Sequence, residues 1–448
     1  MMSRRMARAF PVALVLLQLS SLRALAQGPP IDAARARQYF AEAKAFSDKD
    51  NGALWKVPLC GPLLFVDQET RYTVANQADA EGNLKPLDGV FAGTAPQELG
   101  VANTATKWAG VEWTMVMWPL PQYQQPRLRL TLHECFHRVQ GQIGLPPTDA
   151  QNGHLDSLDG RVWLQMEWRA LEHAFWQHGD ERKRDVADAV YFRNYRRSLF
   201  PAAIKNENAL EMNEGLADYT GFKLSTSSPE EYAVVVSAWV RSAPTRTPSY
   251  GRSFAYTSGP AYGGLLDAAN KDWRKGLTPI TDLGQLLASA YGVDVPATAG
   301  LNKAEALRRA QRYDGDEVVA IETEKEVKHQ ARLAAARKAF VDGPVLKLSV
   351  SDEFNYTFDP NAVLAIDDRL TLYEGDIQVS DAWGLLKITE GVLFVRENGK
   401  VVRVQVPAPA DATKSPLSGS GWTLDLKPRW QVVPEGRAGD FATRKRNP

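Results

Sequence analysis

The segment 131–138, Thr-Leu-His-Glu-Cys-Phe-His-Arg, constrains this chain more than any other stretch. It holds His133 and His137 four positions apart, with Glu134 directly after the first histidine. On a helix, residues four apart lie on one face, one turn above the other. Two imidazoles placed in this way bind one Zn²⁺ at about 2.0–2.1 Å each. Glu134 would then lie beside the metal, which suits a general base acting on a metal-bound water.

The flanking residues predict that this segment is a helix. Pro126 fits the first helical turn, where its missing N–H is not needed. Gly144 and Pro146 mark the end. An apolar stripe at helical spacing runs between these limits. Its members are Leu128, Leu132, Phe136, Val139 and Ile143.

A catalytic zinc site needs a third protein ligand and one position left open for water. The segment 209–219 offers Glu214 and Asp218, which are four apart and therefore share a helix face. The alternative is a solvated acidic face. Apolar neighbours favour burial instead, and a buried carboxylate needs a partner or a metal. Glu211, one turn before Glu214, is the second candidate for the ligand.

The HExxH segment 133–137, followed by the Asn-Glu-x-x-x-Asp segment 213–218, resembles the gluzincin metallopeptidases, the thermolysin-like clan. In that clan a downstream helix supplies a Glu as the third zinc ligand. An Asp four residues later hydrogen-bonds a zinc-binding histidine from behind, which fixes the imidazole tautomer and raises its basicity. The resemblance therefore implies that Asp218 supports His133. It implies one Zn²⁺ with three protein ligands, namely His133, His137 and Glu214.

The resemblance also implies an oxyanion donor downstream of the third ligand. A Tyr, His or Arg near the zinc stabilises the oxyanion that peptide hydrolysis creates. Three residues are candidates, namely Tyr256, Tyr262 and Arg252, of which Tyr262 is preferred. Ser258 and Pro260 predict that a helix begins at this point and carries Tyr262.

Residues 111–118 alternate in a way that predicts a strand with two largely apolar faces. In gluzincins an edge strand before the zinc helix holds the substrate backbone. By resemblance, 111–118 is a candidate for that strand. An interior strand without substrate contact is the equal alternative.

The two cysteines, Cys60 and Cys135, leave a disulfide open. A buried thiol that fills space in the zinc helix is the alternative for Cys135. Cys135 points about 160° away from His137 around the helix, which argues against a role as zinc ligand.

The N-terminus reads as a targeting segment. Arginines precede an apolar run at 11–22, and Ala24-Leu25-Ala26 matches a cleavage signal. We expect a signal peptide at 1–26 and an exported protein, periplasmic or extracellular. No later apolar run is long enough to predict stable membrane insertion. The 53 basic and 53 acidic residues cancel, which gives no reason to expect nucleic acid as a partner.

The order of patterns predicts an α+β fold in two domains. Residues 27–343 suit a zincin-like catalytic domain, with a mixed sheet before the HExxH helix and a mostly helical remainder. Asp342-Gly343-Pro344 breaks a long charged helix. Short strand-like runs follow, so 344–440 suits a small β-sandwich or barrel.

Together these features predict an exported zinc metallopeptidase that hydrolyses a peptide or protein substrate, with Glu134 as base and Tyr262 as oxyanion donor. Two alternatives remain. One is a zinc hydrolase that acts on cell-envelope material rather than peptides. The other is a zinc-retaining binding protein without activity. Glu134 argues against the latter, because catalysis needs this carboxylate and zinc retention does not.

Overall fold

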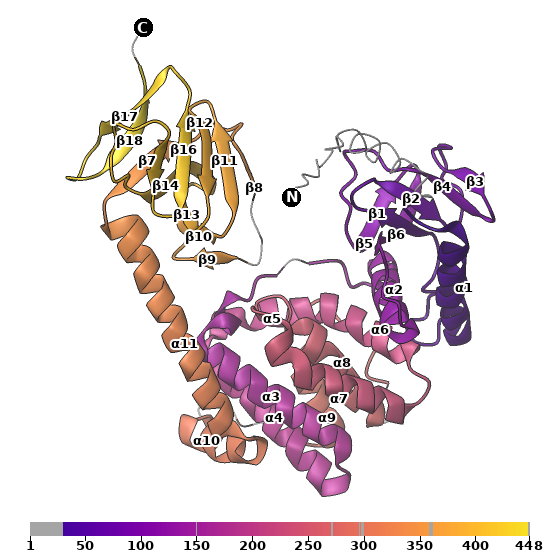
Figure 1. Cartoon of the computed structure of the whole chain (residues 1–448). Coiled ribbons are helices and arrows are strands. Elements are labelled where there is room, and N and C mark those ends of the chain that lie inside the picture. The colour runs from indigo at the N-terminus through magenta and orange to yellow at the C-terminus, as the bar shows by residue number, and fades with distance from the viewer. Residues whose placement is uncertain are drawn as a thin grey trace, which may run out of the picture. The chain divides into compact units, whose positions relative to one another are not determined.

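A computed structural model of the chain describes residues 30–446, apart from 149, 270–271, 295, 297–299 and 358–361 (Figure 1). The predicted signal peptide, 1–26, lies outside these residues. The chain divides into two compact units, Met1–Val319 and Ala320–Pro448. The first combines a mixed sheet with many helices and the second is mostly strands, so the predicted α+β class is confirmed.

The first unit holds a six-stranded sheet in the order β3-β4-β2-β1-β6-β5. Only β1 and β6 pair in parallel. All other neighbouring strands pair antiparallel, including β1 with β2. The strands are β1 (Leu63–Asp67), β2 (Tyr72–Ala75), β3 (Lys85–Leu87), β4 (Val90–Thr94), β5 (Thr104–Trp108) and β6 (Val111–Trp118).

Apolar residues cover both faces of this sheet, because successive side chains of a strand point to opposite sides. On one face, Leu63 and Phe65 join the main core together with the helices. On the other face, Leu64 and Val66 pack with Trp113 in a second cluster. Both faces of the sheet are therefore covered, and its outer strand β5 has a strand neighbour, β6, on one side only.

Helices make up the rest of the first unit. The N-terminal ones are α1 (Ala33–Asp50), α2 (Gln124–Val139), η1 (Gly153–Asp156), α3 (Leu158–Trp176) and α4 (Gly179–Leu199). The next are η2 (Pro201–Ala203), α5 (Ile204–Leu210), η3 (Glu211–Gly215), α6 (Leu216–Ser225) and α7 (Pro229–Arg246). The last are α8 (Ala255–Ala268), α9 (Leu283–Tyr291), α10 (Lys303–Ala310) and η5 (Gln311–Tyr313). The next helix, α11 (Gly315–Arg337), begins in this unit.

Helix α2 lies between the sheet and the helical part of this unit (Figure 1). It packs against β5 and β6 on one side and against α6 on another. Its apolar stripe is buried as predicted, with Leu128, Leu132 and Phe136 each at most 2% exposed. This burial holds the polar residues of α2 against α6 and the turn before it.

The second unit contains two sheets. The larger has the order β17-β18-β7-β14-β13-β10-β9, and the smaller has the order β15-β16-β12-β11-β8. Their strands are β7 (Val345–Ser349), β8 (Asn355–Thr357), β9 (Val363–Ala365), β10 (Leu370–Glu374), β11 (Ile377–Asp381) and β12 (Gly384–Ile388). The remaining strands are β13 (Gly391–Glu397), β14 (Lys400–Pro407), β15 (Leu417–Gly419), β16 (Trp422–Leu426), β17 (Trp430–Pro434) and β18 (Phe441–Lys445).

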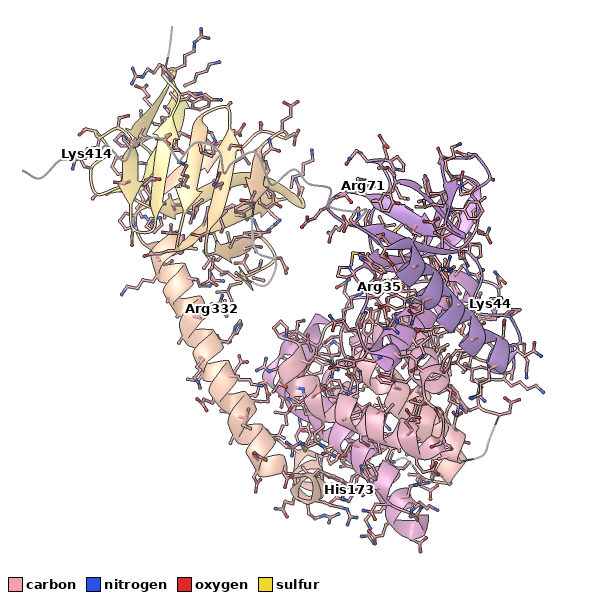
Figure 2. All side chains as sticks on the ribbon, turned by 45° about the vertical axis from the view of Figure 1, so that its right-hand side comes forward. Arg35, Lys44, Arg71, His173, Arg332 and Lys414 are labelled. Atoms are coloured by element: carbon pink, nitrogen blue, oxygen red, sulfur yellow. The ribbon has the colours of Figure 1, made fainter. Side chains whose placement is uncertain are left out.

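One core of this unit joins residues of both sheets, among them Val379 and Phe394. The end of α11 and the π-helical turn η6 (Lys338–Asp342) cover a second cluster on the larger sheet, which includes Phe340 and Leu393. Arg332 of α11, labelled in Figure 2, also forms an ion pair with Glu374 of β10.

The two compact units divide inside α11, after Val319. The sequence places its domain boundary later, between 343 and 344, where the strands begin. The limits 27–343 and 344–440 stay a prediction. Among the described residues, no helix combines the length and the apolar character that crossing a membrane requires.

Candidate metal centre

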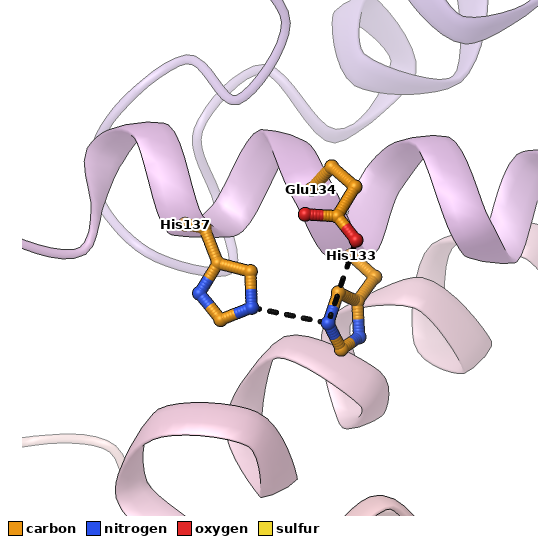
Figure 3. A group of neighbouring side chains, drawn as sticks. All are labelled: His133, Glu134 and His137. Carbon is orange, nitrogen blue, oxygen red and sulfur yellow. Dashed lines mark hydrogen bonds and ion pairs between the residues drawn. The ribbon is translucent and has the colours of Figure 1, made fainter. Parts of the chain in front are cut away.

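Helix α2 brings the two histidines of the HExxH segment together. Nε2 of His133 lies 3.0 Å from Nε2 of His137. Figure 3 shows both rings on the same side of the helix, with Glu134 beside them. His133 and Glu134 are each 5% exposed, so the group is sheltered from solvent.

Glu214 reaches the same point from the facing element. Its Oε2 lies 3.4 Å from Nε2 of His133 and 3.3 Å from Nε2 of His137. In a tetrahedral site, bonds of about 2.0–2.1 Å place neighbouring donor atoms about 3.3 Å apart. The three donors therefore form a triangle of the size that Zn²⁺ takes.

Glu134 is the competing third ligand, since its carboxylate also lies within 4.8 Å of the two ring nitrogens. We favour Glu214 because Oε1 of Glu134 is 3.9 Å from Nε2 of His133, further than Glu214 is from either ring. This leaves Glu134 next to the metal position, where a base is needed.

Two buried oxygens at this point have no hydrogen-bond partner among the described residues. They are Oε2 of Glu134 and Oε2 of Glu214. An unpaired buried carboxylate oxygen is costly unless a cation or proton is close by. The donor set therefore fits a divalent cation held by His133, His137 and Glu214.

The other nitrogen of each ring faces a side-chain oxygen. Nδ1 of His133 lies 3.2 Å from Oδ1 of Asp218, as the sequence predicts. Nδ1 of His137 lies 2.8 Å from Oε1 of Gln140. Each Nδ1 therefore donates its proton, so each Nε2 can present a lone pair to a cation at the shared point. Nε2 of Gln140 in turn donates to Oδ1 of Asn213 at 2.9 Å, and this bond fixes the orientation of the Gln140 amide.

Asp218 is itself held by Arg129, which lies one turn before His133 on α2. Nη2 of Arg129 donates to both carboxylate oxygens of Asp218, at 2.8 and 2.7 Å. The Arg129 guanidinium also stacks over the Trp239 ring, 3.8 Å from its centroid. Sequence reasoning missed Arg129 and Gln140, although helical spacing from the two histidines places both on the right face.

The acidic neighbours change the pKa values of this group. Burial lowers the pKa of His133, but the carboxylates of Asp218 and Glu214 outweigh it and raise the pKa to about 10. Burial raises the pKa of Glu134, and the two histidines only partly oppose it. Glu134 is thus a stronger base than an exposed glutamate, which suits proton transfer near neutral pH.

Glu214 sits in η3, a π-helical turn between α5 and α6. Single π-turns inside helices are frequently found at functional sites. Gly259 of α8 allows close approach to this turn, because a Cβ there would lie 2.2 Å from the carbonyl oxygen of Gly215. This contact brings the start of α8 to the metal centre.

The start of α8 contributes Tyr256 to the centre, and the turn before this helix contributes Arg252. The Tyr256 ring lies parallel to the His133 ring, with centroids 5.5 Å apart. Nη2 of Arg252 donates to Oε1 of Glu214 at 2.7 Å. Burial and the Glu214 carboxylate raise the pKa of Tyr256, which keeps its hydroxyl protonated as a donor.

The preference for Tyr262 as oxyanion donor needs correction. This side chain is fully buried, and its hydroxyl donates to Oε1 of Glu167 at 2.7 Å, away from the metal centre. Helix α8 begins at Ala255, before the expected start at Ser258. Tyr256 therefore lies in the first turn and takes the place at the site.

The structure also decides between two pairs of alternatives that the sequence left open. Glu211, the second candidate for the ligand, is fully buried and binds Arg193 at 2.8 Å instead of facing the histidines. The strand predicted at 111–118 is β6, and it lies between β1 and β5, so the interior alternative is confirmed and the edge alternative is wrong. The edge strands of this sheet are β3 and β5, and β5 is the one beside β6.

A cavity of about 450 Å³ opens onto the metal centre. Its walls combine the start of β5, the loop after α2 and the start of α8. The lining residues are Asn103, Thr104, Ala105, His133, Glu134, His137, Pro147, Thr148, Asn213, Glu214, Arg252 and Tyr256. A larger cavity, about 1020 Å³, shares none of these residues. Cavity size alone therefore does not identify the candidate site.

Comparison with family models, with curated proteins and with solved structures finds no match for this chain.

Proposed function

We propose that this chain is a zinc-dependent metallopeptidase of the gluzincin type. The observation that carries the proposal is the meeting of three donor atoms, where Oε2 of Glu214 lies within 3.4 Å of both Nε2 atoms. The orphaned oxygens of Glu134 and Glu214 support it, because a cation compensates their burial.

Zn²⁺ bound to His133, His137 and Glu214 would lower the pKa of water at the open position and polarise a substrate carbonyl. Glu134 supplies the proton transfers. Its Oε2 has no competing hydrogen bond within the described part of the chain. It can therefore accept the proton of the attacking water and later deliver it to the leaving amine.

Tyr256 and Arg252 are the donors for the oxyanion in this proposal. Both line the cavity, and both belong to the segment that α8 brings to the centre. Arg252 already binds Glu214, so its guanidinium lies beside the donor triangle. Hydrogen bonds from such donors stabilise charge that develops on the carbonyl oxygen.

The outer strand β5 favours a peptide over other substrates. Residues Thr104 and Ala105 of this strand line the cavity, and β5 has a neighbour, β6, on only one side of the sheet. An extended peptide can add to such an edge through main-chain hydrogen bonds. A peptide bound in this way would have its scissile bond beside the metal, which supports a peptidase over a hydrolase of other cell-envelope material. Export of the chain stays a prediction from the segment 1–26.

The test separates catalysis from metal binding. Glu134→Gln keeps the size of the side chain but removes the base. We expect hydrolysis of a fluorogenic peptide library to fall at least about 10³-fold, while zinc content by mass spectrometry stays at the wild-type level.

Glu98→Gln serves as the control, because Glu98 is exposed and lies outside the cavity. It should keep full activity. Unchanged hydrolysis by the Glu134 variant would refute the proposed base. A wild-type protein that binds zinc yet cleaves no peptide would direct the search to non-peptide substrates.

A further inference from the structure

Two thiols meet on the face of α2 that points away from the metal centre. Sγ of Cys60 lies 3.5 Å from Sγ of Cys135, although 75 positions separate them in the chain. Both are free cysteines in this structure. Cys135 stands two residues from each zinc-binding histidine, which is about 160° around the helix. A covalent change at Cys135 would therefore leave the donor atoms in place.

The backbone on the Cys60 side is already fixed against two helices. The Cys60 N–H donates to Oγ of Ser47 in α1 at 3.0 Å. Nη2 of Arg138 in α2 donates to the carbonyl of Leu59 at 2.6 Å. Gly61 packs so closely on that guanidinium that a Cβ would lie 2.7 Å from Nη2. The two sulfur atoms are thus held facing each other at 3.5 Å, compared with about 2.05 Å in a disulfide bond.

We propose that Cys60 and Cys135 are a redox-active dithiol pair, which a disulfide oxidant converts into a cross-link between the segment before β1 and the metal-binding helix. Cys60 is the entry point, because it is partly exposed whereas Cys135 is fully buried. The oxidant class is a small disulfide such as oxidised glutathione.

The reaction balances in two exchange steps. The Cys60 thiolate attacks one sulfur of oxidised glutathione, forms a mixed disulfide and releases one glutathione thiolate. The Cys135 thiolate then attacks Sγ of Cys60 and releases the second glutathione. The protein loses two hydrogens, and one oxidised glutathione becomes two reduced ones. The disulfide closes a loop that contains β1 to β6. It should therefore stabilise the sheet and its attachment to α2 against unfolding.

The experiment counts thiols in the full, zinc-loaded chain before and after incubation with excess oxidised glutathione. The protein is then denatured and treated with N-ethylmaleimide, and its intact mass is measured. We expect two adducts on the reduced protein and none on the oxidised one, which also loses about 2 Da. Peptide mapping without reductant should recover Cys60 linked to Cys135. Dithiothreitol should restore both adducts.

A thermal scan tests the mechanical consequence. Closing a loop of this length is expected to raise Tm by about 5–10 °C. Cys60→Ser should take up one maleimide and show no oxidant-dependent change in Tm. Two adducts on oxidised wild type, or glutathione that remains on Cys60, would overturn the proposal. These readouts do not involve hydrolysis, so they stand apart from the outcome for the peptidase.

Discussion

Nε2 of His133 faces Nε2 of His137 at 3.0 Å, while the Nδ1 atoms of both rings are engaged with side-chain oxygens. This arrangement turns two lone pairs toward each other in a buried place. It is unfavourable unless a proton or a cation lies between them. The carboxylate of Glu214 lies at the same point and favours a divalent cation over a proton. The cation balances more negative charge and binds all three donor atoms.

Metal removal should therefore destabilise the protein. A ligand at about 1,000 times its Kd stabilises the folded state by about 4 kcal/mol. We expect Tm to fall by several degrees when a chelator strips the zinc, and to recover on adding zinc back. The His133→Ala variant should have the Tm of the metal-free protein before any treatment, and the chelator should not change that Tm. A wild-type Tm that does not respond to the chelator would contradict the metal site.

Glu214 and Glu211 stand three positions apart and should respond differently to the same change. Glu214→Gln removes a charged ligand, so we expect loss of stoichiometric zinc. Glu211→Gln weakens a fully buried ion pair with Arg193, which should cost about 3 kcal/mol or more in unfolding free energy. Its zinc affinity should stay close to wild type while the protein is folded.

Mass spectrometry for zinc and urea unfolding of the metal-free proteins measure the two effects separately. If the Glu211 variant lost zinc and the Glu214 variant kept it, the assignment of the third ligand would have to be reversed.

The two tyrosines of α8 offer a second matched pair. Tyr256→Phe should lower kcat by about 10²-fold or more, with zinc content unchanged, because one oxyanion donor is lost. Tyr262→Phe should keep kcat but lose about 1–2 kcal/mol of stability, since Glu167 loses a buried hydrogen bond. Steady-state kinetics and thermal unfolding of both variants decide this. Equal kcat values for Tyr256→Phe and wild type would remove Tyr256 from the proposal.

Local spacing in the sequence predicted the parts of the site that lie on single helices. His133 and His137 are four residues apart and therefore share a helix face, and the same holds for Glu214 and Asp218. Both pairs could be recognised from the sequence without knowing that they lie together in the structure. Their arrangement in space agrees with the third ligand and the support for His133 that the resemblance implied.

Long-range contacts decided what the sequence did not predict. Pro260 suggested a helix start, but α8 passes through it. Proline cannot donate to the Tyr256 carbonyl four residues before it. Nε1 of Trp239, on α7, donates there instead at 2.9 Å. In the same way, the parallel pairing of β1 with β6 makes β6 interior, and no local pattern reports which strand becomes the edge.

Arg129 should matter for metal affinity although it touches no metal ligand directly. Arg129→Met leaves the buried Asp218 without its bidentate partner, so the carboxylate holds His133 less well. Changes of this kind typically cost about 10–100-fold in metal affinity. Competition with a zinc indicator measures that loss. Arg241→Met is the control, because its side chain is 71% exposed and pairs with Glu172 away from the site.

Asp79 should make the first unit sensitive to acid. Burial raises the pKa of this carboxyl, but N–H groups of Asn83, Leu84 and Glu81 outweigh it and lower the pKa to about 2, from the ordinary 3.8. The folded pKa is therefore the lower one. The stabilising contribution is complete above about pH 4 and is lost as the pH falls toward about 2.

Asp79→Asn should therefore destabilise the protein by about 1–2 kcal/mol at pH 7, after allowing for solvent screening, and by progressively less below pH 4. The side chain of Asn accepts fewer of the three backbone hydrogen bonds, which have donor–acceptor distances of 2.9, 3.0 and 2.6 Å. Urea midpoints of variant and wild type at pH 7, 4 and 3 measure the difference. Glu81→Gln, an exposed neighbour in the same loop, should follow the wild-type profile. A stability gap for Asp79→Asn that stays constant between pH 7 and 3 would show that the carboxylate charge does not hold this loop.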